Sequence, residues 1–266
     1  MSSTLPATGS AERHGDIWSE RARDWAENEE QQVPTYQEAI RRLGLAAADS
    51  VLDVGCGSGV FLRLAADRGA EVYGIDAAEA LIALARRRVP EADVCVGDMQ
   101  FLPYADDAFD LVCGFNSFFF AADMVAALRE AGRVSKPGGR ILIQVWGDPE
   151  RCSLTAMKHA VFPLGPPPPA DAPTPPRLWE PGVLEGIASR AGLEPVEAFD
   201  LMYAFEYVDE ETLVRLTLAP GLVVEAIRVS GEDAVKEAIV ESMAPYRSTD
   251  GSYRVENEWH FLVATA

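Results

Sequence analysis

The sequence predicts an α/β protein with a doubly wound, mostly parallel sheet. Short runs of β-branched and apolar residues alternate with segments whose apolar residues recur at helical spacing, which is typical of repeated strand–helix–strand units. The first unit, residues 50–76, contains a strand, a glycine-rich loop, a helix and a second strand that ends in a carboxylate. With 266 residues, the chain is long enough for one such domain with additional helices.

Gly55, Gly57 and Gly59 follow the strand expected at residues 51–54. Glycines at alternate positions let the backbone turn sharply and approach a ligand that a Cβ atom would keep away. Asp53 lies two residues before this loop, where its charge would repel a pyrophosphate and attract a ligand that carries an amine. The loop therefore favours a cationic ligand.

Asp76 lies at the carboxyl end of the second strand, residues 71–75, which follows a helix expected at residues 60–68. Ligands of open parallel sheets bind beyond the carboxyl ends of the strands, and a carboxylate there can accept hydrogen bonds from both hydroxyls of a ribose. This position indicates a nucleoside-containing ligand. A nicotinamide-dependent oxidoreductase is disfavoured, because its G-x-G-x-x-G loop would need glycine where Val60 stands, one residue after Gly59.

Residues 53–59, DVGCGSG, and the acid at Asp76 resemble the first motif and the ribose-binding acid of class I S-adenosylmethionine (SAM)-dependent methyltransferases. Further matches follow in order: G-D at 97–98 with L-P-Y at 102–104, F-D-L-V at 109–112, and K-P-G-G at 136–139. The resemblance implies a Rossmann-like, seven-stranded, doubly wound sheet with an antiparallel last strand. It also implies SAM as the methyl donor and S-adenosylhomocysteine (SAH) as its product.

The resemblance assigns roles to individual residues as well. Asp98 would accept a hydrogen bond from the adenine amino group, and Met99 would pack on the ring or bond to it. A backbone carbonyl near Phe115 or Asn116, together with Asp53, would hold the amine of SAM. The expected cofactor-binding residues are Asp53, Gly55, Gly57, Gly59, Asp76, Ala77, Asp98, Met99, Phe115, Asn116 and Trp25.

The N-terminal segment, residues 1–35, is expected to form a tail and a helical cap. Residues 1–12 are small and polar, which predicts disorder. In the helix expected at residues 14–32, Trp18, Ala22 and Trp25 share one apolar face. This face fits either a surface helix docked on the core or a cap over the cofactor, with Trp25 as the preferred contact.

Residues 36–150 would form the SAM-binding core. Its remaining elements are expected as helices at 35–43, 77–89 and 124–134, strands at 93–96, 111–115 and 141–146, and a tight turn at 135–140.

Residues 151–266 would build the acceptor pocket, a lid and the end of the sheet, all within one compact domain. The expected elements are helices at 152–162 and 182–191, a stiff proline-rich loop at 163–176, strands at 194–207 and 252–266, and lid helices between 209 and 243, broken at Pro220-Gly221 and Ser230-Gly231.

The predicted chemistry is an in-line transfer of the methyl group, for which the protein supplies mainly proximity, alignment and exclusion of water. A general base is needed only where the acceptor is protonated and weakly nucleophilic. His159 and His14 are the candidate bases, and His260, inside the last strand, is expected to be structural. Tyr36, Tyr203, Tyr246 and Glu258 remain unranked further candidates.

Aromatic residues in the variable part of the chain favour a small, largely apolar acceptor. The expected substrate contacts are Phe118, Trp146, Phe162, Trp179 and Tyr203.

The composition narrows the range of partners. The net charge of −19 disfavours nucleic acids and anionic membranes. The four cysteines form no C-x-x-C pair and no metal-ligand cluster is apparent, so we expect a protein without a metal. The N-terminus has no apolar segment of a secretory signal, so we expect a cytoplasmic protein. The alternatives are an RNA or protein methyltransferase and a SAM-binding partner or scaffold protein that does not methylate. A homodimer is left open.

Overall fold

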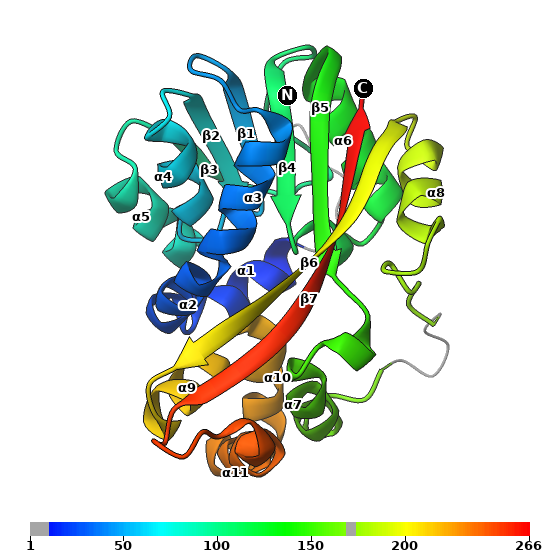
Figure 1. The fold of residues 1–266 in the computed structure, drawn as a ribbon. Helices are drawn as coiled ribbons and strands as arrows, with labels where there is room; N and C mark the ends of the chain where they lie inside the picture. The colour runs from blue at the N-terminus through cyan, green and yellow to red at the C-terminus, as the bar shows by residue number, and fades with distance from the viewer. Residues whose placement is uncertain (1–10, 169–173) are drawn as a thin grey trace, which may run out of the picture.

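The computed structural model describes residues 11–168 and 174–266 and contains the predicted seven-stranded, doubly wound sheet (Figure 1). The strand order is β3-β2-β1-β4-β5-β7-β6, and β7 runs antiparallel to both of its neighbours. The strands are β1 (Ser50–Val54), β2 (Glu71–Asp76), β3 (Asp93–Val96), β4 (Phe109–Phe115), β5 (Ser135–Trp146), β6 (Glu194–Tyr207) and β7 (Tyr253–Thr265). The order reverses between β1 and β4, so their carboxyl ends form the crevice in which such sheets bind ligands.

Each face of the sheet is covered by helices. On one face, Val51 and Cys113 belong to a core with α3 (Val33–Leu43), α4 (Val60–Ala66) and α5 (Glu79–Arg88). The opposite core contains strand residues one position further along, such as Leu52 and Val112, packed against α6 (Met124–Val134) and α8 (Val183–Arg190). This alternation arises because successive side chains of a strand point to opposite faces.

The last two strands extend beyond the rest of the sheet. Residues 259–265 of β7 pair with β5, whereas residues 253–258 pair only with β6. Figure 1 shows this ribbon reaching past the carboxyl end of β4 to a group of lid helices. These helices are α7 (Leu154–Val161), α9 (Glu210–Thr217), α10 (Gly221–Ser230) and α11 (Glu232–Met243), with the predicted breaks before α10 and α11.

Two expectations for local structure are wrong. The single helix predicted at residues 14–32 is divided into α1 (Ala11–Ser19), α2 (Ala22–Glu29) and a short 3₁₀ turn. The division lets α1 pack on α5 and α10 while α2 packs on α5 and α9. Residues 135–140 belong to β5 instead of a separate turn, since Ser135 already pairs with Phe109 before a bulge interrupts the register.

Two further expectations fall partly outside the described residues. Residues 1–10 of the predicted disordered tail are not described, while residues 11 and 12 belong to α1. Within the predicted proline-rich loop, residues 169–173 lie outside the description, and the loop begins with a 3₁₀ turn, Phe162–Leu164. Within residues 11–168 and 174–266, no helix is both long and apolar enough to cross a lipid bilayer.

Ion pairs connect the N-terminal cap, α1 and α2, to the lid helices about two hundred residues away in sequence. Four arginines form them, two on the cap and two on the lid. The pairs are Arg13 with Glu225, Arg21 with Glu232, Arg215 with Asp24 and Glu27, and Arg228 with Asp16 and Glu20. The pairs hold the N-terminal cap against the lid helices across the crevice.

Replacing Arg215 and Arg228 together by Ala is expected to increase local opening of the cap. Exposed ion pairs are individually weak, so amide hydrogen exchange of residues 11–29 in the double variant should accelerate only severalfold at low salt. High salt screens the same pairs in the wild-type protein, whose exchange rates should then approach those of the variant. Arg254→Ala is the control, because Arg254 pairs with Glu206 and Glu256 on the β6–β7 ribbon. Equal exchange in the double variant and in the control would contradict the role of the cap–lid pairs.

Candidate functional site

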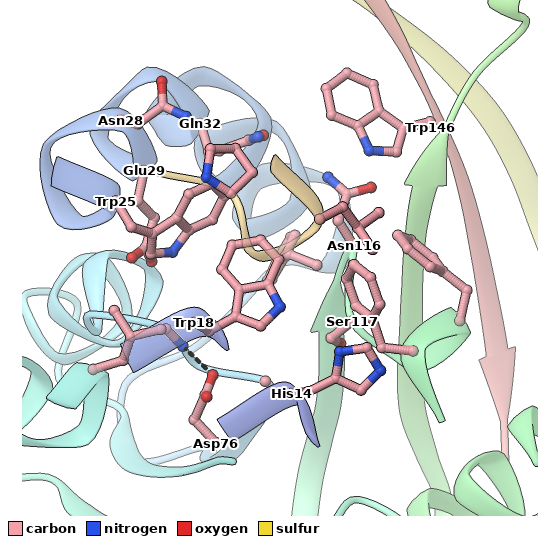
Figure 2. A pocket seen from close by; sticks show the side chains of 18 of the residues that line it. His14, Trp18, Trp25, Asn28, Glu29, Gln32, Asp76, Asn116, Ser117 and Trp146 are labelled. Atoms are coloured by element: carbon pink, nitrogen blue, oxygen red, sulfur yellow. Dashed lines mark hydrogen bonds between the residues drawn. The ribbon is translucent and has the colours of Figure 1, made fainter. Parts of the chain in front are cut away.

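A cavity of about 530 Å³ lies at the carboxyl ends of the central strands, beneath the cap and the lid. Its walls combine the glycine loop and the ends of β2, β4 and β5 with residues from α1, α2, α7 and the lid. Figure 2 shows Trp25 and Glu29 on one side of this cavity and Trp146 on the other. This is the crevice predicted from the strand order.

The glycine loop adopts a backbone conformation that other residues rarely take. Gly55, Gly57 and Gly59 have φ angles of +80°, +53° and +82°. A Cβ atom on Gly57 would lie 2.8 Å from Oε2 of Glu29, and one on Gly55 would lie 2.4 Å from Cβ of Ser117. Gly55 and Gly57 line the cavity, whereas Gly59 packs against α5 and does not reach it.

Asp76 connects the end of β2 to the glycine loop. Its Oδ2 accepts a hydrogen bond of 2.9 Å from the amide of Gly57, and its Oδ1 accepts one of 2.8 Å from the amide of Ala78. Burial raises the pKa of Asp76, and these backbone amides partly oppose the shift. The carboxylate lies on the cavity wall, at the position expected for a ribose-binding acid.

Asp53 does not lie where we expected it. It is buried behind the glycine loop, away from the cavity wall, with Oδ1 3.7 Å from Sγ of Cys113. Burial, together with the charges of Glu29 and Asp76, raises the pKa of Asp53 well above its usual value. Side chains alternate along β1, and Asp53 faces the core that contains Val51, so direct contact with a ligand amine is not supported.

Glu29 is a component of this site that the sequence analysis missed. It comes from the C-terminal end of α2 and accepts a hydrogen bond of 2.8 Å from the amide of Ser58 in the glycine loop. Burial raises the pKa of Glu29 to about 7, opposed by the contact with Ser58 and the charge of Arg88. No local motif distinguished Glu29 from the neighbouring acids of the E-N-E-E run at residues 27–30, because only the packing of α2 turns it inward.

Most of the other expected cofactor residues lie together on the cavity wall. They are Trp25, Ala77, Asp98, Met99, Phe115 and Asn116. Asp98 caps its own turn by accepting a 2.8 Å hydrogen bond from the amide of Gln100. Asn116 has a φ of +52°, an uncommon value for a non-glycine residue, and its buried Oδ1 has no hydrogen-bond partner among residues 11–168 and 174–266.

Two further polar atoms on the cavity wall, Nδ1 of His14 and Oδ1 of Asn28, are buried without a partner in the described part of the chain. Buried polar groups are normally hydrogen-bonded, and an unpaired one costs about 1–3 kcal/mol. With Oδ1 of Asn116, these atoms therefore indicate a polar ligand in the cavity.

The aromatic walls agree only in part with the predicted substrate contacts. Trp146, Phe162 and Trp179 line the cavity. Phe118 and Tyr203 do not: Phe118 is fully buried in the core with α6, and Tyr203 packs beside Trp259.

Other aromatic residues complete these walls. Phe119 and Phe120, which follow Phe118 in a 3₁₀ turn, line the cavity. So does Trp18, which the sequence placed on the cap helix without a role, and whose ring meets that of Trp25 edge-on at 4.6 Å.

The histidines divide into three environments. His14 faces the cavity with its ring 5.1 Å from that of Phe120, and burial, followed by the charge of Arg13, lowers its pKa. His159 is exposed on α7, and the structure does not bring it to the cavity wall. His260 lies on β7 with Nδ1 2.7 Å from Oδ1 of Asp200. In the part of the chain that the structure describes, no cluster of side chains could hold a metal ion.

Comparisons with known proteins agree with this geometry. Residues 52–143 match the family model described as a methyltransferase domain. An uncharacterized protein of Mycobacterium tuberculosis is 31% identical over 258 residues, covering 90% of this chain and 88% of the relative. A malonyl-[acyl-carrier protein] O-methyltransferase of Serratia marcescens is 35% identical over 105 residues, 38% of this chain and 41% of the relative.

Among solved structures, that of a putative methyltransferase from Bacillus halodurans superimposes with a TM-score of 0.59 at 17% identity, covering 86% of this chain and 97% of that one. At this identity the match supports the fold alone. Together, the sequence matches, the fold and the order of the motifs show that the chain belongs to the class I SAM-dependent methyltransferase family.

Proposed function

We propose that this methyltransferase binds SAM at the glycine-loop end of the cavity and passes the methyl group to a small, largely apolar acceptor bound beside it. The observation that carries the proposal is the division of one cavity into a carboxylate-rich end at Glu29, Asp76 and Asp98 and an aromatic end at Trp146 and the lid. A volume of about 530 Å³ suits small molecules, whose pockets are usually about 300–1,000 Å³.

The charge of the glycine-loop end supports a cationic ligand. SAM carries a sulfonium and an ammonium group, and opposite charges strengthen each other's ionised forms. Glu29 and Asp53 are buried here and Asp76 is half-buried, and loss of solvent raises the pKa of each. A bound cation would lower these pKa values again, because it favours the ionised carboxylates. Without a cation, keeping these carboxylates ionised away from water is unfavourable.

The remaining roles follow from position. Asp76 would accept hydrogen bonds from the ribose, and Asp98 and Met99 would contact the adenine. Trp18 and Trp25 would cover the cofactor from the cap, and Asn116 would offer its unpartnered Oδ1 to a ligand donor.

The methyl transfer itself depends chiefly on alignment and exclusion of water. Aromatic and aliphatic walls from the lid would exclude water around the reacting atoms. His14 is the histidine on the wall, and its lowered pKa leaves it neutral near pH 7, so it can accept a proton from an acceptor that loses one.

The first test is isothermal titration calorimetry with SAM, SAH and, as a control, NAD. We expect micromolar binding of SAM and SAH and no binding of NAD. Absence of SAM and SAH binding would contradict the proposed function. With binding established, transfer of label from methyl-labelled SAM to a library of small acids, phenols and amines would identify the acceptor.

Asp76→Asn should weaken SAH binding by about 2 kcal/mol, the order expected when a charge-assisted hydrogen bond to a ligand is lost. Calorimetry measures the change. Asp67→Asn, at an exposed site at the end of α4, should bind SAH like the wild type. Unchanged affinity in Asp76→Asn would exclude Asp76 from the cofactor site.

Glu29→Gln should stabilise the ligand-free protein at alkaline pH. The pKa of Glu29 is about 7 in the folded state and 4.5 as a free side chain, so protonation favours folding. This contribution is fully present below pH 4.5 and is lost as the pH rises through about 7, which removes up to about 3 kcal/mol in the wild type. Gln keeps an oxygen for the amide of Ser58 and carries no charge.

Urea unfolding at pH 5 and pH 8.5 measures this difference. The stability of Glu29→Gln relative to the wild type should rise between the two pH values, and that of Glu30→Gln, at the exposed neighbour, should stay nearly constant. A relative stability of Glu29→Gln that does not change with pH would show that the Glu29 carboxylate is not strained by its burial.

A further inference from the structure

A lysine lies in the apolar end of the cavity, opposite the carboxylates. Lys158, on α7, lines the cavity with its Nζ 3.7 Å from the centre of the Trp146 ring. Trp146 is the last residue of β5 and stacks on the buried Trp259, with 5.7 Å between ring centroids. The ammonium group therefore lies over a ring that is fixed by the sheet.

The surroundings of Lys158 are apolar. Leu154, Met157 and Phe162 line the same part of the wall from α7 and the turn that follows it. Among the described lining residues Lys158 is the only lysine or arginine, and no carboxylate of the described residues forms an ion pair with it. A cation that is half-buried among apolar groups is costly, and contact with one aromatic face offsets only part of this cost.

The pKa of Lys158 agrees with this geometry, since burial lowers it to about 8. An anionic ligand within reach of Nζ would favour the charged amine and remove the unfavourable desolvation.

We propose that the methyl acceptor is an apolar molecule with one anionic oxygen group, such as an aromatic carboxylate or an ionised phenol or enol, and that Lys158 pairs with this group while Trp146 and the lid contact the apolar part. This inference rests on the proposed function, because it assigns the apolar end of the cavity to the acceptor. Lys158 acts in it as a specificity-determining residue.

The test uses a matched pair of probes, 2-naphthoate and its neutral analogue 2-naphthamide, titrated into SAH-saturated protein by calorimetry. Wild-type protein should bind naphthoate at least about tenfold more tightly than naphthamide, as expected for a charge-assisted pair in an apolar site. Lys158→Met should abolish this preference and leave naphthamide binding nearly unchanged. Lys158→Arg should retain a preference for the anion.

Lys236→Met is the matched control, because Lys236 pairs with Glu232 on the surface of α11. It should keep the full preference for naphthoate. Equal binding of the two probes by the wild type, or an undiminished preference in Lys158→Met, would overturn the inference.

SAH binding is measured first in every variant and should not change. A wild-type protein that fails to bind SAH would contradict the proposed function. In that case the two probes would be compared in the absence of SAH, and this comparison would still decide whether Lys158 selects an anion.

Discussion

The crowding of three carboxylates, Glu29, Asp53 and Asp76, around one glycine loop is the constraint on which the site depends. The three carboxylates come from the cap, from β1 and from β2, and burial raises the pKa of each. Amides of the loop and its flanks hold two of them, Glu29 through Ser58 and Asp76 through Gly57. The loop, the strand ends and the cap are thereby fixed relative to one another in an arrangement that a cationic ligand would complete.

The cavity has opposite charges at its two ends. Carboxylates surround the proposed donor, and Lys158 lies over Trp146 where the acceptor is proposed to bind. A cationic donor at one end and an anionic group at the other would bind in one relative orientation, and apolar walls strengthen both ionic contacts by excluding water. Such an arrangement would select the acceptor by its charge as well as by its shape. Apolar contacts alone distinguish similar molecules only weakly.

Closure of the cavity joins segments from opposite ends of the chain. The β6–β7 ribbon carries the lid helices beyond the edge of the sheet, and the cap packs between them and the strand ends (Figure 1). Arginines of both segments pair with acids of the other, so part of the chain's large negative charge is neutralised at this boundary. Because these pairs are largely exposed, they allow opening for ligand exchange.

The sequence by itself determined the strand–loop–helix unit and the place of Gly55, Gly57 and Asp76, because residues adjacent in the chain fix each of these features. The antiparallel last strand was expected from the family resemblance, since its direction depends on pairing with distant strands. Only the tertiary structure decided which side chains of the added helices face the cavity. Lys158 and His159 are neighbours in α7, and successive helical residues point about 100° apart, so one faces the cavity and the other the solvent. Their directions depend on how α7 packs against the other lid helices, chiefly α11, which lies about eighty residues further along the chain.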